Sequence, residues 1–169
     1  MIQLADALLV IDVQNGVCYE DNKIFNYDEL INNINKRIDQ YKKENRKIIF
    51  IQHVDDILVE NSTEWQIVPD LDTSKGDYFI NKTHANSFHQ TDLEEILTKE
   101  NVNSIELCGA QTEYCVDSTV KFAHGLGYKG QMISGNSTTY TNQFMSAAET
   151  IQFYENIWDK RFLSLYRED

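Results

Sequence analysis

The sequence has few cysteines, few basic residues and no long hydrophobic run, and each shortage excludes a class of protein. Its three cysteines, Cys18, Cys108 and Cys115, are odd in number and widely spaced, so they favour a reduced, cytoplasmic protein over a disulfide framework. Its 15 Lys and Arg stand against 27 Asp and Glu, which argues against binding to nucleic acid or to an anionic membrane. No apolar run reaches the ~18 residues of a membrane span, and the first residues lack the basic stretch of a secretory signal.

Proline is almost absent, and this bears on the number of domains. The single proline, Pro69, leaves no Pro-rich linker, and no internal repeat is present. With 169 residues, 41% of them hydrophobic, the chain is long enough for one domain with a substantial core and short for two. We therefore expect a single domain over residues 1–169.

Short apolar runs alternate with segments of helical spacing along the chain. The run from Ala7 to Ile11 lies between two aspartates, which is typical of a strand buried on both faces of a parallel sheet. Similar runs predict strands at 47–51, 78–80, 104–109 and 130–133, and 161–166 fits an edge strand. Helices are predicted at 27–44, at 91–99 with Thr91 and Glu94 as a capping box, from 112 to about 124, and at 142–160. This alternation predicts an α/β fold with a doubly wound, mostly parallel sheet of five or six strands and helices on both faces, a Rossmann-type three-layer architecture.

Three potentially reactive residues follow different predicted strands. Asp12 ends the first strand, Lys82 follows the third, and Cys115 lies just past the fourth, where a helix begins. Ligands of such sheets bind at the carboxyl ends of the strands, so we expect the three side chains to meet there. A helix start and an ammonium group both favour a thiolate, and a carboxylate can take a proton from the thiol and give it to a leaving amine.

Each of these residues also has an ordinary structural explanation. An aspartate after a strand often caps a turn, a lysine there is commonly solvated, and a cysteine is often a small core residue. Only their joint placement favours a site.

Longer motifs around these residues resemble the isochorismatase-like cysteine hydrolases, a superfamily that includes nicotinamidases and related amidohydrolases. The segment 9–15 resembles the motif of the first strand, and 51–53 resembles the end of the second strand. The segment 81–88 is similar to the one that holds the catalytic lysine, and 108–116 matches the nucleophile motif. The motifs occur in family order and at family spacing.

The resemblance implies a role for each matching residue. Cys115 would be the nucleophile, Asp12 the general acid and base, and Lys82 the charge that supports the thiolate. A cis peptide bond is implied between Ala110 and Gln111, which would direct the N–H groups of Gln111 and Cys115 into an oxyanion hole. A fold of the isochorismatase type, a small-molecule substrate, no cofactor and a homo-oligomer are also implied.

Two departures from relatives narrow the expected chemistry. Nicotinamidases hold a metal with an Asp-x-His pair and further histidines after the second strand, whereas here His53 stands alone. A metal site is therefore not expected. Isochorismatases have a glycine at the position of Cys115 and cleave a vinyl ether. Retention of Cys115 favours attack on a carbonyl carbon, and so hydrolysis of an amide or ureide C–N bond through a Cys115 thioester.

The substrate pocket and the competing functions are less defined by the sequence. His53, Trp65, Phe88 and Tyr114 are candidate pocket residues, and for Trp65 and Phe88 a place in the core is an equal alternative. An isochorismatase-type or ester-cleaving hydrolase is the alternative within enzymes. A flavodoxin-like binding module or a non-catalytic subunit is the alternative outside them. The substrate, and whether the loop 54–77 or a partner closes the pocket, are not determined by the sequence.

Overall fold

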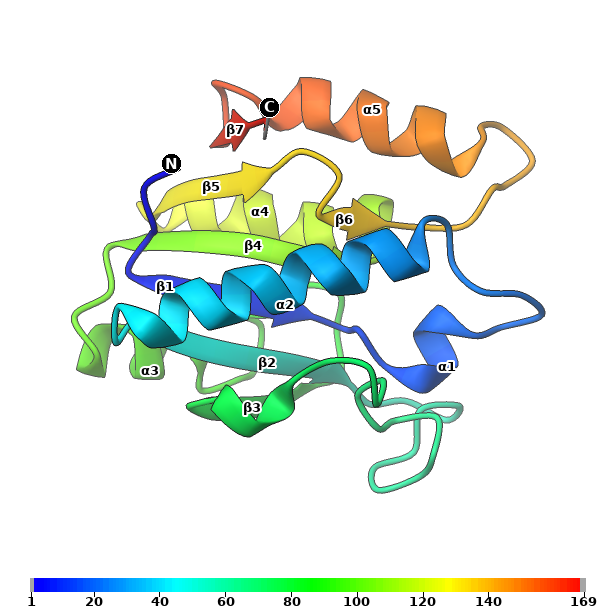
Figure 1. Ribbon diagram of the computed structural model, residues 1–169, viewed down its shortest axis with the longest axis horizontal. Helices are drawn as coiled ribbons and strands as arrows, with labels where there is room; N and C mark the ends of the chain where they lie inside the picture. The colour runs from blue at the N-terminus through cyan, green and yellow to red at the C-terminus, as the bar shows by residue number, and fades with distance from the viewer. Residues whose placement is uncertain (1, 168–169) are drawn as a thin grey trace.

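A parallel sheet with helices on both faces forms the molecule, of which the computed structural model describes residues 2–167. Six strands follow one another in the order β3-β2-β1-β4-β5-β7, and the two-residue β6 pairs with β4. Every one of these pairings is parallel, so the carboxyl ends of the strands lie at the same edge, toward α1 in Figure 1. The strands are β1 (Ala7–Ile11), β2 (Lys47–His53), β3 (Tyr78–Lys82), β4 (Ser104–Ala110), β5 (Lys129–Ile133), β6 (Ser137–Thr138) and β7 (Leu163–Tyr166). The predicted α/β fold is confirmed.

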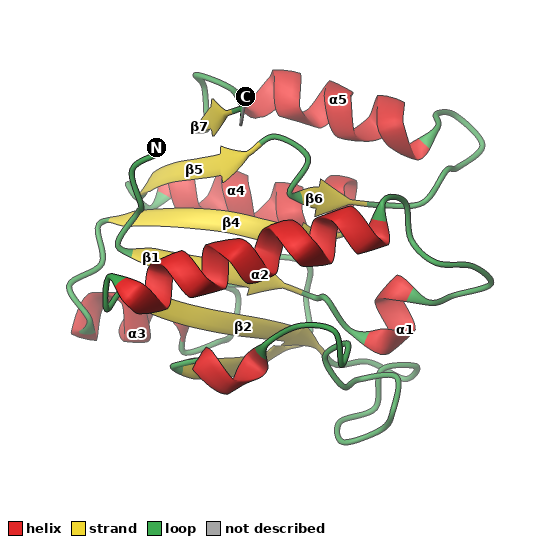
Figure 2. Cartoon of the chain, viewed as in Figure 1, coloured by secondary structure: helices red, strands yellow, loops and turns green. Residues whose placement is uncertain are grey.

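Helices cover the two faces of this sheet, and the loops gather at its ends (Figure 2). The long helix α2 lies across one face, and α3 and α4 lie across the other (Figure 1). The helices are α1 (Asn15–Cys18), α2 (Tyr27–Lys43), α3 (Leu93–Lys99), α4 (Asp117–Gly125) and α5 (Ala147–Trp158), with a 3₁₀ turn at Thr73–Lys75 and a π-helical turn at Thr112–Val116. None of the described helices is both long and apolar enough to cross a membrane.

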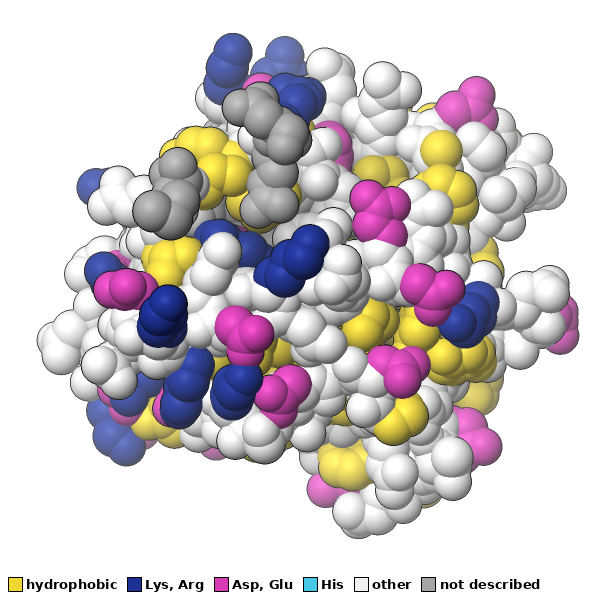
Figure 3. All heavy atoms as spheres, viewed as in Figure 1, with side chains coloured by type: hydrophobic (Ala, Val, Ile, Leu, Met, Phe, Trp, Pro, Cys, Tyr) yellow, Lys and Arg dark blue, Asp and Glu magenta, His cyan; other side chains and the backbone are white. Residues whose placement is uncertain are grey.

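The alternation of side chains along β1 divides the core into two layers. Leu8 and Val10 pack with the apolar stripe of α2, whereas Leu9 and Ile11 pack with α3 and α4. Helix α2 buries its residues at helical spacing and has acidic residues in its first turn and lysines in its last turn, both favourable for the helix dipole. On the face shown in Figure 3, basic side chains are interspersed with acidic ones.

Two helix starts differ from the sequence predictions. The capping box expected at Thr91 is wrong, because the N-cap of α3 is Asp92 and the Thr91 hydroxyl donates to the Ser87 carbonyl instead. Helix α5 begins at Ala147 rather than near 142, because Ser146 and Glu149 form a capping box that stops the helix from extending further back.

Candidate active site

Four neighbouring strand ends supply the polar groups of one site. The sheet order places the ends of β3, β2, β1 and β4 side by side, and these strands end at Lys82, at His53, just before Asp12, and just before the turn that carries Cys115. His53 and Lys82 are direct partners in the register of β2 and β3. The site is therefore assembled by the parallel ladder, in agreement with the expectation that ligand sites form at this edge.

The Lys82 ammonium lies at the centre of this group. Its Nζ atom is 2.8 Å from Asp12 Oδ2, 3.0 Å from His53 Nδ1 and 3.2 Å from Cys115 Sγ. The side chains of Lys82 and Asp12 are only 0% and 2% exposed, so their ion pair is buried. One charged group therefore holds three polar side chains in fixed positions around it.

The backbone at the ends of β1 and β4 brings Asp12 and Cys115 together. Asp12 has a positive φ of 50° and donates its backbone N–H to the Ile51 carbonyl at 2.9 Å, so the chain turns directly at the acid. On β4, a Cβ atom at Gly109 would lie 2.1 Å from the Ile11 oxygen. Glycine is required there for the close approach of β4 to β1.

A short turn after β4 presents Cys115. The peptide bond between Ala110 and Gln111 is cis, and the π-helical turn that follows contains Cys115 and precedes α4. The Thr119 hydroxyl donates to the Cys115 carbonyl at 2.7 Å, and its oxygen accepts the backbone N–H of Ser87 at 3.1 Å. Thr119 thereby connects the turn that contains Cys115 to the segment that follows Lys82.

The thiol of Cys115 is protonated at rest. Burial, together with the charge of Asp12, raises the pKa of Cys115 to about 12, and the nearby Lys82 opposes only part of this rise. The support for a thiolate expected from the helix start and from Lys82 is therefore outweighed. Asp12 Oδ1 is buried and has no hydrogen-bond partner within residues 2–167, which leaves an acceptor for the thiol proton next to the ion pair.

His53 and Gln14 extend the site, and sequence reasoning gave Gln14 no role. Burial and the Lys82 ammonium lower the pKa of His53, so its ring is neutral and Nδ1 accepts from Lys82. The other ring nitrogen, Nε2, then carries the proton and lies 3.5 Å from Asp55 Oδ2. The Gln14 side chain bonds both backbone groups of His53 and also the Trp65 carbonyl. The available signal in the sequence was the position of Gln14, two residues after Asp12.

A cavity of about 360 Å³ opens above these groups. Asp12, Cys115 and His53 line it from the strand ends, and Gln111 lines it from the cis peptide. Helix α1, the residue Glu20 just after it, and the start of the loop after β2 supply the remaining wall, which consists of Gly16, Val17, Glu20, Asp55, Ile57 and Leu58. Its size is that of a site for a small molecule.

Trp65, Phe88 and Tyr114, three of the four predicted pocket residues, lie outside this cavity. The Trp65 indole donates to Asn81 at 3.1 Å on the outer side of β3. Phe88 is buried in the core and packs against the ring of Tyr128. Tyr114 is 59% exposed, although it directly precedes Cys115 in the turn. Only His53 of the predicted set lines the cavity.

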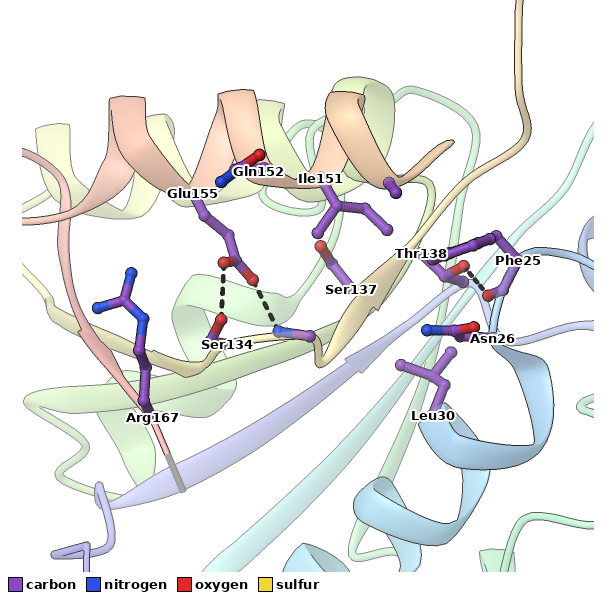
Figure 4. A pocket seen from close by; sticks show the side chains of 12 residues that line it. Phe25, Asn26, Leu30, Ser134, Ser137, Thr138, Ile151, Gln152, Glu155 and Arg167 are labelled. Atoms are coloured by element: carbon purple, nitrogen blue, oxygen red, sulfur yellow. Dashed lines mark hydrogen bonds between the residues drawn. The ribbon is translucent and has the colours of Figure 1, made fainter. Parts of the chain in front are cut away.

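A second cavity, of about 410 Å³, lies between α5, the start of α2 and the segment after β5 (Figure 4). Glu155 of α5 points into it and accepts hydrogen bonds from the Ser134 hydroxyl and the Gly135 N–H at 2.8 and 2.7 Å. Both carboxylate oxygens are therefore used by the protein itself. No cysteine, lysine or histidine lines this cavity among the described residues, so we place the chemistry at the first one.

The donor set of the site does not suit a metal ion, although three possible ligands converge there. Donor atoms of Asp12, His53 and Cys115 all lie within 4.8 Å of one another. The Lys82 ammonium already bonds all three. A divalent cation would have to displace this buried positive charge, and no other metal-binding cluster occurs within residues 2–167.

We expect the purified protein to hold no stoichiometric metal, because Lys82 occupies the position a metal would take. Elemental analysis after dialysis against a chelator and then against zinc measures this directly. Lys82→Ala is the matched variant: it leaves the three donors without their cation and should retain zinc that the unmodified protein does not retain. Zinc that stays bound one-to-one to the unmodified protein would contradict this assignment.

Comparison with known proteins agrees with this geometry. The model of the isochorismatase domain matches residues 6–153. The isochorismatase family protein YwoC of Bacillus subtilis is 28% identical over 154 residues, which cover 81% of this chain and 79% of YwoC. A crystal structure of an isochorismatase family protein is 42% identical, covers 94% of this chain and 96% of its own, and has a TM-score of 0.91. The ureidoacrylate amidohydrolase RutB of Agrobacterium fabrum is 27% identical over 77 residues, 46% of this chain and 34% of its own. The chain belongs to the isochorismatase family of hydrolases, and its arrangement of Asp12, His53 and Cys115 is consistent with a cysteine hydrolase.

Proposed function

We propose that this protein hydrolyses the C–N bond of a small amide or ureide through a thioester on Cys115, without a metal ion. The observation that carries the proposal is the contact of one buried ammonium, Lys82 Nζ, with both the Asp12 carboxylate and the Cys115 sulfur beside the cavity. Nucleophile, acid–base group and fixed positive charge are then within bonding reach of a bound carbonyl.

The first half-reaction forms the thioester. The Cys115 proton passes to Asp12 as Sγ bonds to the carbonyl carbon, so a free thiolate never has to accumulate despite the raised pKa of the thiol. We assign the N–H groups of Gln111 and Cys115 to the carbonyl oxygen that becomes negative. Asp12 then gives the proton to the departing nitrogen, and the C–N bond breaks.

The second half-reaction restores the enzyme. Water enters where the amine has left. Asp12 takes a proton from this water as the water oxygen bonds to the thioester carbon. The C–S bond breaks, the sulfur regains a proton, and the carboxylic acid leaves. Throughout both halves Lys82 keeps its hydrogen bonds, so that the negative charge shifts between Asp12 and Cys115 beside a constant cation.

Two further points support C–N cleavage. A cysteine suits attack on a carbonyl carbon, since its sulfur forms a thioester that water can hydrolyse. The relative RutB is named for an amidohydrolase activity, although the match covers less than half of this chain.

The proposal is tested by measuring ammonia release from a panel of small amides and ureides, with Cys115→Ala as the control. We expect release that depends on Cys115, and an acyl adduct on Cys115 in the intact mass after rapid acid quench of a slow substrate. Undiminished release by Cys115→Ala would contradict the nucleophile assignment. Cysteine-dependent turnover of matched esters without any turnover of amides would contradict the C–N specificity.

A further inference from the structure

The wall of the catalytic cavity carries fixed negative charge. The Asp55 Oδ1 atom accepts the backbone N–H groups of Ile57 and Leu58 at 2.8 and 2.7 Å, so the carboxylate is held in place at the mouth. These hydrogen bonds, with smaller effects of His53 and Lys82, lower the pKa of Asp55, and the group is ionised at neutral pH. Glu20, an exposed residue just after α1, adds a second carboxylate to the lining.

No positive charge in the lining balances these carboxylates. Among the described residues that line the cavity, none is lysine or arginine. The Lys82 side chain beneath it is 0% exposed and is paired with Asp12. His53 is neutral, because burial and Lys82 lower its pKa. An anionic group of a ligand would therefore meet two carboxylates and no partner.

The segment that supplies this wall strengthens the effect. Residues 54–66 contribute Asp55, Ile57 and Leu58 to the lining, and they include four acidic residues and no lysine or arginine. A ligand approaching the cavity passes through a negative potential, which attracts cations and repels anions. The same lining includes apolar side chains, among them Val17 and Leu58, which suit a short hydrocarbon chain.

We propose that the substrate is a small amide whose acyl portion carries a positively charged group, held by Glu20 and Asp55 while its carbonyl lies at Cys115. This inference rests on the proposed function, since it takes Cys115 as the reacting end of the cavity. The carbonyl and the cation are then joined by a hydrocarbon chain that packs against Val17 and Leu58.

Three amides of similar length test the charge preference: delta-aminovaleramide, hexanamide and the monoamide of glutaric acid. We expect kcat/KM for ammonia release to fall in that order, with a difference of about tenfold or more between the cationic and the anionic amide, since exposed charge pairs are weak individually and two act together here. Added salt should reduce the difference, because it screens exposed charges.

Matched variants distinguish the effect of the two cavity carboxylates from the effect of the net charge of the protein. The double variant Glu20→Gln, Asp55→Asn keeps the shape and the oxygen that accepts from Ile57 and Leu58, and it should remove most of the preference. The double variant Glu44→Gln, Glu95→Gln removes an equal charge at the far end of α2 and on α3, and it should preserve the preference (Figure 1).

Two outcomes would overturn the inference, and they differ from failure of the proposed function. Cysteine-dependent hydrolysis that is equal for the three amides, or fastest for the glutaric monoamide, overturns the charge preference while amide hydrolysis stands. Absence of Cys115-dependent release from all three counts against the proposed function. In that case the charge preference is tested by calorimetry, which measures the affinity of Cys115→Ala for each of the three amides. Tighter binding of the anionic amide also overturns the inference.

Discussion

Replacing Asp12 with asparagine should reduce turnover by about four orders of magnitude or more, and Cys115→Ala should do the same. Asparagine cannot take the thiol proton, and burial, the largest cause of the raised pKa of Cys115, remains in the variant, so little nucleophile would form at neutral pH. The double variant should be little worse than the worse single variant, because both residues act on one proton path. Rate constants of the two single variants and the double variant for one amide give the comparison.

The raised thiol pKa adds a pH signature to this result. An ordinary cysteine ionises with a pKa of about 8.5, and its reactivity rises through that range. In the folded protein the Cys115 thiol stays protonated until about pH 12, so kcat/KM should show no thiol ionisation between pH 7 and about 10. Thiolate absorbance in the ultraviolet provides the independent measurement. Undiminished turnover in Asp12→Asn at neutral pH would contradict the role given to Asp12.

Arg37→Met should lower the free energy of unfolding by about 3–5 kcal/mol, since it leaves a buried carboxylate without its partner. Arg37 of α2 donates two hydrogen bonds to Glu106 of β4, at 2.6 and 2.5 Å. Tyr41 and Gln131 donate to the same carboxylate at 2.9 and 2.8 Å. Glu106 is fully buried between the sheet and α2, so water cannot replace the lost guanidinium.

Urea unfolding of three variants tests this arrangement. The double variant Arg37→Met, Glu106→Leu removes both charges and should recover much of the loss, because an apolar pair tolerates burial better than a lone charge. Lys23→Met breaks the exposed pair with Asp28 and should leave the unfolding free energy nearly unchanged. A double variant less stable than Arg37→Met alone would show that the ion pair itself, and not the isolated charge, determines the effect.

The sequence predicted well those elements whose structure is determined by their own local residue pattern. The run Ala7–Ile11 is buried on both faces and forms β1 with the predicted bounds, because five apolar residues between aspartates have few other stable arrangements. The convergence of Asp12, Lys82 and Cys115 followed from topology alone, since all three residues lie at carboxyl ends of parallel strands. Helix α1 and strand β6 were not predicted, because four and two residues are too few to establish a period.

Features that depend on strand register and on long-range contacts could not be predicted from the sequence. The contact between His53 and Lys82 follows from their pairing in adjacent strands, and a shift of one residue would have turned one of them to the other face. Likewise, the cavity wall depends on where the loop after β2 folds back over α1, as shown by the Gly16 N–H, which donates to the Glu64 carbonyl at 2.8 Å. Tyr114 and Phe88 could not be placed without these contacts.

The assembly of the site from adjacent strand ends separates two properties that evolution or design can change independently. The spacing between the reacting groups is set by the parallel sheet, because neighbouring strands lie about 4.8 Å apart whatever side chains they carry. The rest of the cavity lining comes from α1, from Glu20 just after it and from residues 55–58, which belong to no strand. If the proposed function holds, we expect that another loop grafted between His53 and Tyr78 changes the substrate preference and leaves the reaction the same.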